Sequence, residues 1–420
     1  RVPQRLAGST PALGTMTKQS NIEPRNSGVE TKKEHISSNL RIISLGGLEE
    51  VGRNMTVMEY ENDIIIIDMG LQFPEEDMPG IDYIIPNVSY LLPKKGNIRG
   101  IIITHGHYDH IGAIPHLMPQ LGFDIPIYGS DLALAIIQRR QEDFKHLTQK
   151  LNLKEITSET SLQLGSFKIE FFSVSHNIPG SMGLIIYSPV GIIIHTGDFK
   201  IDLKSDISGK IEIQKIKALG SKNVLALLSD STNASEPGHQ FSEKEIKIEL
   251  EEIISNTKGR LIIGTFSSLL GRLNQIINLA EKYHKKVAIV GYSMKTNVEI
   301  GRKLGYLNFK PETLIPVKNI DRYPSQRLVI LATGAQGEER AALMRIANRE
   351  ERFVKIQPKD TVVFSSSVVP GNERTVQRLT DKLYHEGADV VNYRMLDIHA
   401  GGHAKQEDLK MMLKLINPRY

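Results

Sequence analysis

The sequence contains no cysteine among its 420 residues. This absence excludes disulfide frameworks, thiolate metal sites, iron–sulfur clusters and a cysteine nucleophile. Long apolar runs are also lacking, because stretches such as Ile64–Ile67 and Ile101–Ile103 are far shorter than the roughly 18 residues that a membrane span requires. The first forty residues contain no apolar segment of the kind found in signal peptides. Any metal must therefore be held by imidazole and carboxylate groups, and the cytoplasm is the expected compartment.

A large charge of one sign is lacking as well. The 52 Lys and Arg residues against 48 Asp and Glu residues leave a formal charge of +4, which allows a local basic groove but no strongly basic coat. A content of 40% hydrophobic and 24% charged residues is typical of a globular chain. The length predicts two or three domains.

The composition and the hydrophobic pattern of the sequence change twice along the chain. Residues 1–38 are rich in small and polar residues without a hydrophobic period, which predicts a flexible tail. From Asn39 onwards, short apolar runs alternate with turns and predict a sheet-rich region. After about Thr232, strands alternate with helices, which predicts a parallel, doubly wound sheet. The helices expected there cover residues 243–255, 272–283, 338–348 and 373–385, with a further helix starting at Asn297.

The densest chemical signal is an H-x-H-x-D-H cluster directly after the apolar strand Gly100–Ile103. It contains His105, His107, Asp109 and His110. These side chains can converge only if the strand ends in a tight turn that leads into a helix, and Gly106 permits such a turn. Three imidazoles and a carboxylate suit zinc or a similar first-row ion. A histidine-rich surface loop is the alternative interpretation.

Two later residues fit the same site. His176 follows the strand Phe167–Phe172, and Asp198 follows the strand Ile192–Ile194. Each alone is more often a turn residue, but beside the first cluster both are predicted to be ligands. A carboxylate can bridge two metals about 3.5–4 Å apart, an arrangement used for phosphodiester cleavage.

These residues resemble a known family. The H-x-H-x-D-H cluster, the later His176 and the later Asp198 resemble the metallo-β-lactamase fold, and the strand–helix region resembles the β-CASP domain of nucleic-acid-processing members. The best resemblance is to the ribonuclease J family, over nearly everything from Leu40 to Tyr420. Besides the metal motif, the segments that carry it are Gly46–Asn54, Asp68–Gly70, Ser229–Asn233, Ala332–Glu338, Ser365–Glu373 and His399–His403.

The resemblance implies an α/β architecture, a metallo-β-lactamase αββα sandwich with an inserted β-CASP domain. The expected division is a first metallo-β-lactamase part at 39–232, the β-CASP domain at 233–395 and an incomplete return to the first domain at 396–420. It also implies that the full-length protein forms a homo-oligomer, that other RNA-decay proteins are partners, and that no membrane is involved.

The resemblance further implies roles for individual residues. One metal is expected on His105, His107 and His176, a second on Asp109 and His110, with Asp198 bridging them. Two divalent ions are expected, zinc first, with manganese or magnesium as alternatives. The expected nucleophile is a hydroxide that bridges the metals. Asp109, Asp230 and His403 are the expected catalytic residues, Asp230 orienting a ligand or the water and His403 acting as general acid or phosphate contact.

A pocket for the 5′-monophosphate of RNA is a second implication. Its expected residues are Ser365, Ser366, Ser367, Gly371, His399, Gly401 and His403. A plain strand-to-helix loop is the alternative for the serine segment. The family usually has serine in the middle of H-x-S-G-H, and this chain has Gly401 there, so one hydroxyl contact is expected to be lost.

The implied activity is 5′→3′ exonuclease and endonuclease cleavage of single-stranded RNA, preferably 5′-monophosphorylated, in RNA maturation and decay. Three alternatives stay open. They are a sibling β-CASP nuclease acting on DNA or on messenger-RNA 3′ ends, a small-molecule metallo-hydrolase, and an RNA-binding scaffold with a degenerate site. Basic residues such as Arg272, Arg302, Arg340 and Arg374 could line an RNA channel or lie on solvated helix faces.

The resemblance also leads to an expectation about the segments that follow the equivalent of Tyr420 in the family. In the family a further strand with one more histidine ligand follows, and then a C-terminal domain associated with dimerisation. Without them, the second metal is expected to bind weakly, a sheet edge to be unpaired, and the chain to be a poor nuclease that is monomeric or loosely associated.

Overall fold

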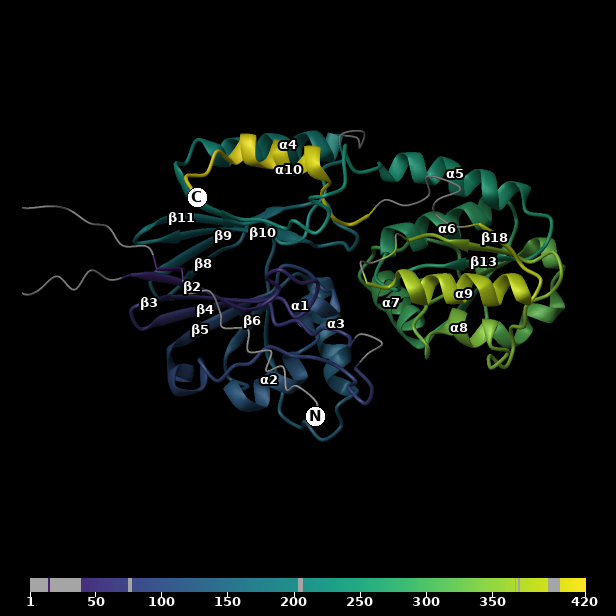
Figure 1. Cartoon of the computed structure of the whole chain (residues 1–420), viewed down its shortest axis with the longest axis horizontal. Helices are drawn as coiled ribbons and strands as arrows, with labels where there is room; N and C mark the ends of the chain where they lie inside the picture. The colour runs from purple at the N-terminus through teal and green to yellow at the C-terminus, as the bar shows by residue number, and fades with distance from the viewer. Residues whose placement is uncertain are drawn as a thin grey trace, which may run out of the picture.

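The computed structural model describes residues 14–15, 39–74, 78–202, 207–366, 368, 371–391 and 401–420. Most of the expected tail at 1–38 therefore lies outside the described residues, as do Ser367, His399 and the expected domain boundary at 395–396. The described chain forms three sheets with helices around them (Figure 1).

The first sheet combines antiparallel and parallel pairing. Its strands, in spatial order, are β1 (Gly14–Thr15), β2 (Leu40–Gly46), β3 (Met55–Tyr60), β4 (Asp63–Ile67), β5 (Ile98–Ile102), β6 (Pro126–Gly129) and β7 (Asn152–Glu155). Pairing is antiparallel from β1 to β4 and parallel from β4 to β7. All four isoleucines of Ile64–Ile67 are buried, because both faces of this sheet are covered.

The second sheet packs face to face on the first. Its strands, in spatial order, are β12 (Val224–Leu228), β11 (Gly191–His195), β10 (Met182–Ser188), β9 (Phe167–Ser173) and β8 (Ser161–Leu164). Ile65 and Ile102 of the first sheet share a buried cluster with Phe167, Ile169 and Leu184 of the second. This cluster is the inner core of a two-sheet sandwich.

Helices cover both outer faces of the sandwich, as Figure 1 shows. Helices α1 (Tyr108–Ile111), α2 (Ile114–Leu121) and α3 (Asp131–Glu142) lie against the first sheet, near the short 3₁₀ helix η1 (Leu92–Asn97). Helices α4 (Ile207–Gly220) and α10 (Gln406–Ile416) lie side by side on the second sheet. The order of layers is therefore helix, sheet, sheet, helix, as the resemblance implied.

The third sheet is wholly parallel and belongs to the inserted region. Its strands, in spatial order, are β15 (Leu314–Ile315), β14 (Lys286–Val290), β16 (Leu328–Ala332), β13 (Leu261–Gly264), β17 (Thr361–Phe364) and β18 (Asp389–Val391). Around it lie α5 (Glu243–Asn256), α6 (Leu270–Lys282), α7 (Tyr292–Lys303), α8 (Ala342–Ala347) and α9 (Glu373–His385), with η2 (Pro311–Thr313), η3 (Val317–Arg322) and η4 (Ser325–Arg327) in the connections. The predicted strand–helix alternation is confirmed.

Two helix boundaries differ from the sequence-based expectation. Helix α7 begins at Tyr292 rather than at Asn297, because Gly291, at φ +120°, turns the chain directly out of β14. Helix α8 begins at Ala342 rather than at Glu338, because Gly334 and Gly337 have positive φ and hold the preceding residues in turns.

The chain enters and leaves the inserted region through two segments that lie side by side. Asn233 and Lys405 form a parallel bridge. Asp408, which is 0% exposed, accepts hydrogen bonds from the backbone N–H of Gln240 at 2.9 Å and of Lys405 at 3.1 Å, and its other oxygen lies 2.7 Å from Nδ1 of His239. One buried carboxylate thus joins the outgoing segment to the returning one.

The end of the chain pairs with the second sheet. The backbone N–H of Tyr420 donates to Leu225 O at 3.0 Å, and the N–H of Leu227 donates to Tyr420 O at 2.9 Å. The final residues thus pair with part of the edge of β12, and the expected unpaired edge stays a prediction for the rest of that edge. Across the described residues, no helix combines the length and apolarity that a membrane crossing would require.

Candidate metal centre

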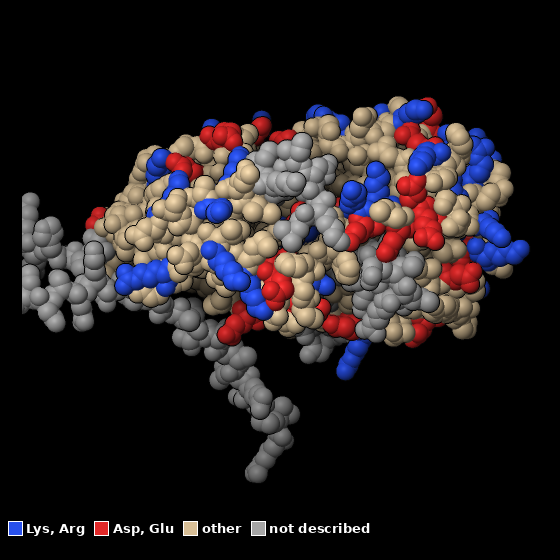
Figure 2. Space-filling model, turned by 90° about the horizontal axis from the view of Figure 1, so that it is seen from above, with Lys and Arg blue, Asp and Glu red and all other residues tan. Residues whose placement is uncertain are grey.

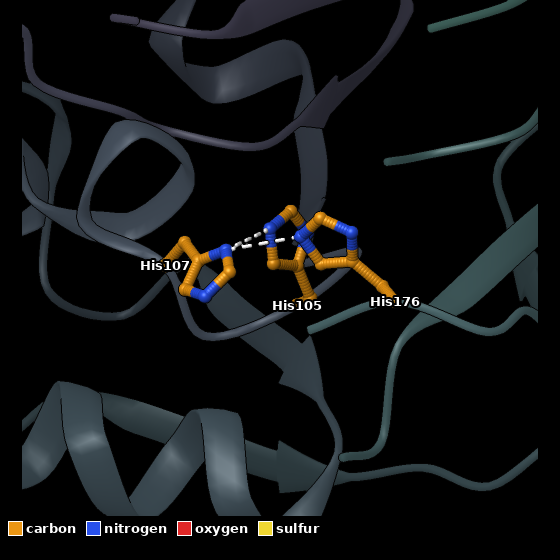
Figure 3. Close-up of side chains that lie close together, drawn as sticks. All are labelled: His105, His107 and His176. Atoms are coloured by element: carbon orange, nitrogen blue, oxygen red, sulfur yellow. Dashed lines mark hydrogen bonds between the residues drawn. The ribbon is translucent and has the colours of Figure 1, made fainter. Parts of the chain in front are cut away.

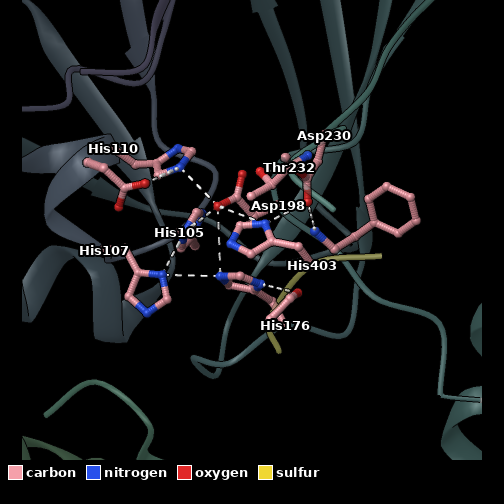
Figure 4. A network of polar contacts seen from close by, with 12 residues as sticks. His105, His107, His110, His176, Asp198, Asp230, Thr232 and His403 are labelled. Carbon is pink, nitrogen blue, oxygen red and sulfur yellow. Dashed lines mark hydrogen bonds and ion pairs between the residues drawn. The ribbon is translucent and has the colours of Figure 1, made fainter. Parts of the chain in front are cut away.

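The expected ligands meet where strands of both sheets of the sandwich end. His105 and His107 follow β5, and Asp109 and His110 lie in the short helix α1. His176 follows β9, and Asp198 follows β11. The structure brings these side chains together with His403 of the returning segment (Figure 4).

One group of donors consists of three histidines. Nδ1 of His107 lies 3.0 Å from Nε2 of His105 and 3.1 Å from Nε2 of His176 (Figure 3). Burial, together with neighbouring histidines, lowers the pKa of His105 and His176 well below the ordinary value, and burial lowers that of His107 to about 4. Neutral imidazoles whose nitrogens converge are what a divalent cation requires, so these three residues fit a metal ion.

The carboxylate of Asp198 lies between this group and a second one. Its Oδ2 atom is 3.2 Å from Nε2 of His110, 3.7 Å from Nε2 of His105 and 3.9 Å from Nε2 of His176. Asp109 lies on the side of His110, with its Oδ2 atom 3.4 Å from Nε2 of His110. The position of Asp198 between the two groups suits the bridging role that the resemblance implied.

Asp68 orients two of these histidines. Its Oδ2 atom accepts from Nδ1 of His110 and from Oγ1 of Thr104, both at 2.8 Å, and its Oδ1 atom accepts from the Thr104 N–H at 2.8 Å. The Thr104 hydroxyl, having donated to Asp68, accepts from Nδ1 of His105 at 3.0 Å. Both imidazoles therefore present Nε2 to the centre. Burial disfavours a charged His110, but Asp198, Asp109 and Asp68 raise its pKa well above the ordinary value.

The returning segment fixes a third histidine. Nδ1 of His176 donates to the carbonyl oxygen of Gly402 at 2.7 Å, which leaves Nε2 free for the centre. A Cβ atom on Gly402 would lie 2.6 Å from Cε1 of His176 and 2.4 Å from Nδ2 of Asn177. Glycine at position 402 therefore allows the close approach that this hydrogen bond requires.

His403 faces the centre beside Asp230. Its Nδ1 atom donates to Oδ2 of Asp230 at 2.8 Å and lies 3.9 Å from Oδ2 of Asp198. Burial opposes protonation, but these carboxylates outweigh it and raise the pKa of His403 to about 9. Thr232 donates both its N–H and its hydroxyl to Oδ1 of Asp230. Asp230 therefore holds a charged imidazole beside the metal ligands.

The expected phosphate residues are only partly brought together. His403 lies at the metal centre and Gly401 lies against Gln240 in the same segment, whereas Ser365 and Ser366 follow β17 and are buried. Within the described ranges, no hydrogen bond joins either serine directly to the metal ligands. Gly371 is exposed, with φ +97°. Ser367 and His399 lie outside the described residues.

Arg272 is not on a solvated face or in an open channel, because it is 2% exposed. Its Nη1 atom donates to Oγ of Ser365 at 2.9 Å, and its Nη2 atom lies 3.0 Å from Oε2 of Glu243. Oε1 of Glu243 also accepts from Nζ of Lys200 at 2.9 Å. Lys200 in turn lies two residues after Asp198, so a chain of charges, buried at Arg272 and Lys200 and 31% exposed at Glu243, joins the serine loop to the metal-bearing part. The sequence did not indicate this chain of charges, and it gave no role to Asp68 or Gly402, although both lie in segments that carry the resemblance.

Comparison with known proteins tests this assignment. The family model described as "Ribonuclease J, beta-CASP domain" matches residues 258–383, and that of the "Beta-lactamase superfamily domain" matches residues 79–214. The "Ribonuclease J2" of Bacillus subtilis is 37% identical over 388 residues, which cover 92% of this chain and 69% of that protein. The chain belongs to the ribonuclease J family.

Other members of the ribonuclease J family are similarly close. The "Ribonuclease J" of Thermus thermophilus is 41% identical over 91% of this chain and 67% of its own length. That of Synechocystis is 42% identical over 91% of this chain and 59% of its own length. This chain thus spans between 59 and 69% of the length of these three relatives. A crystal structure of a protein of unknown function from Enterococcus faecalis shares the fold, with a TM-score of 0.66 and 17% identity over 90% of this chain and 92% of that one.

Membership of the ribonuclease J family defines the enzyme class of the chain and implies that it binds metal ions. The chain is a nuclease of the metallo-β-lactamase superfamily, and that superfamily implies divalent metal ions. The described residues provide imidazole and carboxylate groups that could hold such ions. The alternatives of a small-molecule hydrolase and of a non-enzymatic scaffold therefore give way to the nuclease.

Proposed function

We propose that this chain is the catalytic portion of a two-metal ribonuclease that degrades single-stranded RNA in the 5′→3′ direction and also cuts it internally, in RNA maturation and decay. The observation that carries the proposal is the position of Asp198 Oδ2, within 4 Å of Nε2 of His105, His110 and His176. A single carboxylate between a group of three histidines and a group of Asp109 and His110 suits a two-metal phosphodiesterase.

The proposed ligand sets follow the two groups. His105, His107 and His176 would hold one ion, Asp109 and His110 a second, with Asp198 shared between them. Imidazole-rich sites suit zinc first, with manganese as an alternative, whereas magnesium prefers oxygen ligands. When bound, two such ions would polarise the scissile phosphate and lower the pKa of the attacking water.

The chain's own residues perform the remaining work. Asp68 and the Gly402 carbonyl fix the tautomers of His110 and His176, so that the donor atoms need no reorganisation. His403, kept protonated by Asp230, would give its proton to the leaving oxygen.

We also propose that a pocket for the 5′-monophosphate of RNA is formed by Ser365, Ser366, Ser367, Gly371, His399 and Gly401. In its support, Oγ of Ser366 is buried and has no hydrogen-bond partner among the described residues.

Three further proposals concern the whole protein. The domain division at 39–232, 233–395 and 396–420 is supported by the sheets, because the sandwich and the parallel sheet separate between β12 and β13. RNA is the proposed substrate, with the 5′-monophosphorylated form preferred. Self-association and contacts with other RNA-decay proteins are proposed for the full-length protein. The face in Figure 2 intermingles acidic and basic residues and so offers no single basic surface for RNA.

The test is digestion of one RNA prepared with a 5′-monophosphate, a 5′-triphosphate or a 5′-hydroxyl, in parallel with a DNA of the same sequence and with metal content measured on the same sample. We expect cleavage of RNA, fastest for the monophosphate, and its loss in His107→Ala and Asp198→Ala. His385→Ala is the matched control, because His385 is exposed at the end of α9. Full activity in either ligand variant, or preferential cleavage of DNA, would contradict the proposal.

A further inference from the structure

A series of aromatic and arginine side chains leaves the metal centre along the outer helices of the sandwich. Tyr108 stands between the ligands His107 and Asp109, and the guanidinium of Arg140 lies 4.9 Å from its ring centroid. The same guanidinium lies 5.3 Å from the centroid of Phe144. Phe144 meets the ring of His116 edge to face at 5.0 Å. The series thus begins at the metal ligands and runs outward over α2 and α3.

The series ends in exposed aromatic faces on both parts of the molecule. Tyr83 stacks on His116 with ring centroids 4.2 Å apart and is 41% exposed. At the end of α3, Arg139 lies 5.3 Å from the ring of Tyr292, which begins α7 of the inserted region and is 63% exposed. Figure 1 shows α3 on the side of the sandwich that faces α7. One side of Tyr83 and much of Tyr292 therefore remain open to solvent, and Tyr292 lies at the boundary between the two parts.

Unsatisfied polar atoms gather in the same place. Of the eight buried side-chain atoms without a hydrogen-bond partner among the described residues, four belong to His116 (Nε2), Arg140 (Nε) and Gln141 (both amide atoms). Buried polar atoms normally have partners, so this concentration marks a region of unsatisfied polarity directly beside the aromatic series. Arg139 forms ion pairs with Glu142 and Asp143, whereas Arg140 lies over the rings of Tyr108 and Phe144 and has no ion pair with a carboxylate among the described residues.

We propose that Tyr83, Tyr108, His116, Arg140, Phe144 and Tyr292 form a stacking platform for the unpaired bases of RNA that leads to or from the metal centre. Exposed aromatic faces combined with arginine are the chemistry by which proteins hold single strands, because every base has a π-face and every linkage carries a negative charge. A duplex hides its bases in the stack, so it does not fit this surface.

The platform rests on the proposed ribonuclease function, and it predicts a dependence on bases rather than on phosphates. In EDTA, which prevents cleavage, the affinity for a single-stranded RNA decamer is measured by fluorescence anisotropy beside that for an abasic decamer with the same number of phosphates. For Tyr83→Ala and for Tyr292→Ala we expect RNA affinity to fall on the order of 5- to 100-fold, as loss of one stacked base implies. Affinity for the abasic strand should stay at the wild-type value.

Matched variants separate stacking from structure. Tyr83→Phe and Tyr292→Phe retain the ring and should bind RNA as the wild type does. Tyr384→Ala removes a ring that is 50% exposed on α9, away from this series, and should change nothing. With metal present, hydrolysis of bis-p-nitrophenyl phosphate, which is too small to reach the platform, should be equal in all of these variants.

The outcomes separate the two proposals. If the alanine variants bind the RNA decamer as tightly as the wild type, the platform is wrong, whatever the activity. If they lose affinity equally for both decamers, the contact is with the backbone, and base stacking is overturned. If the wild type binds RNA with the predicted dependence on bases but cleaves no RNA, the platform stands and the proposed function fails.

Discussion

The carbonyl oxygen of Gly402 accepts a hydrogen bond from Nδ1 of His176 at 2.7 Å, across 226 positions of sequence. Through this bond, the segment that returns from the inserted region sets the tautomer of a candidate metal ligand. Assembly of the metal centre is therefore coupled to the docking of residues 401–405, and the coupling can be tested at a single atom.

Gly402→Ala should lower metal content without unfolding the protein. The added methyl group would lie 2.6 Å from the His176 ring, so the ring must move and the three-histidine group loses its geometry. We expect metal affinity to fall about 10–100-fold, the usual effect of disturbing a ligand's hydrogen-bonding partner, as measured by titration with metal analysis. Gly271→Ala is the control, because nothing lies within 4 Å of its added Cβ.

Asp68→Asn should weaken one metal site more than the other. Asp68 holds His110 directly at 2.8 Å and reaches His105 only through Thr104. The group of Asp109 and His110 should therefore lose about 10–100-fold in affinity, while the three-histidine group changes less. Two-step metal titration resolves the sites, and an equal loss at both would contradict this ranking of the two groups.

The effects of substitutions at Gly401 and Gln240 should be coupled. A Cβ on Gly401 would lie 2.5 Å from Nε2 of Gln240, which donates to the His403 carbonyl at 2.8 Å. Gly401→Ser should displace this amide, loosen His403 and slow RNA cleavage. Adding Gln240→Ala should relieve the clash, so the double variant should be more active than the product of the two single effects predicts. Simple multiplication of the effects on kcat/KM would count against the steric explanation.

The charge chain of Lys200, Glu243 and Arg272 should make stability depend on pH. Burial alone would raise the pKa of Glu243, but Lys200 and Arg272 lower it from 4.5 to about 2. A carboxylate with a lowered pKa stabilises the fold fully above its unfolded value, and this contribution is lost as pH falls from about 4.5 towards 2. With allowance for solvent screening, it is worth ~2 kcal/mol at neutral pH.

The measurement for this prediction is urea unfolding of the wild type and Glu243→Gln between pH 3 and pH 7. The difference in unfolding free energy should be largest at pH 7 and should shrink as the pH falls. Glu339→Gln, at an exposed ion pair with Arg378, is the control and should show a difference near zero throughout. A Glu243→Gln difference that is constant with pH would contradict the assigned charge.

The convergence of the candidate metal ligands could be predicted because their signals are local. His105, His107, Asp109 and His110 follow one strand at a spacing that only a turn can reconcile, and His176 and Asp198 each follow an apolar strand. Asp68 carries the same signal after Ile64–Ile67, and sequence reasoning quoted it without giving it a role. Its partners Thr104 and His110 lie 36 and 42 positions away, and only the folded sheet shows that they meet.

The overall architecture was also predictable from local patterns. The features that were not predicted have physical reasons. Strand–helix alternation gave the parallel sheet, and the resemblance gave the sandwich. Helix α4 (Ile207–Gly220) was not predicted, since β-branched isoleucines recur along it and favour strands as readily as helices. The burial of Arg272 was also not predicted. Its guanidinium is surrounded by Glu243 and Ser365, and no local sequence pattern indicates contacts between residues so far apart in the chain.

The two crossing segments joined at Asp408 restrict how the molecule can move. Because both connections to the inserted region lie side by side, that region is attached to the sandwich along a single line. Rotation about this line is a hinge displacement that would keep both connections intact. Contacts elsewhere on the boundary, such as the Tyr306 hydroxyl donating to Asp131 at 2.7 Å and the Arg139–Tyr292 contact, would open and close with such a rotation. In such a rotation, the angle between the inserted region and the sandwich sets the width of the boundary between them. A strand of RNA bound in this boundary would then fix that angle.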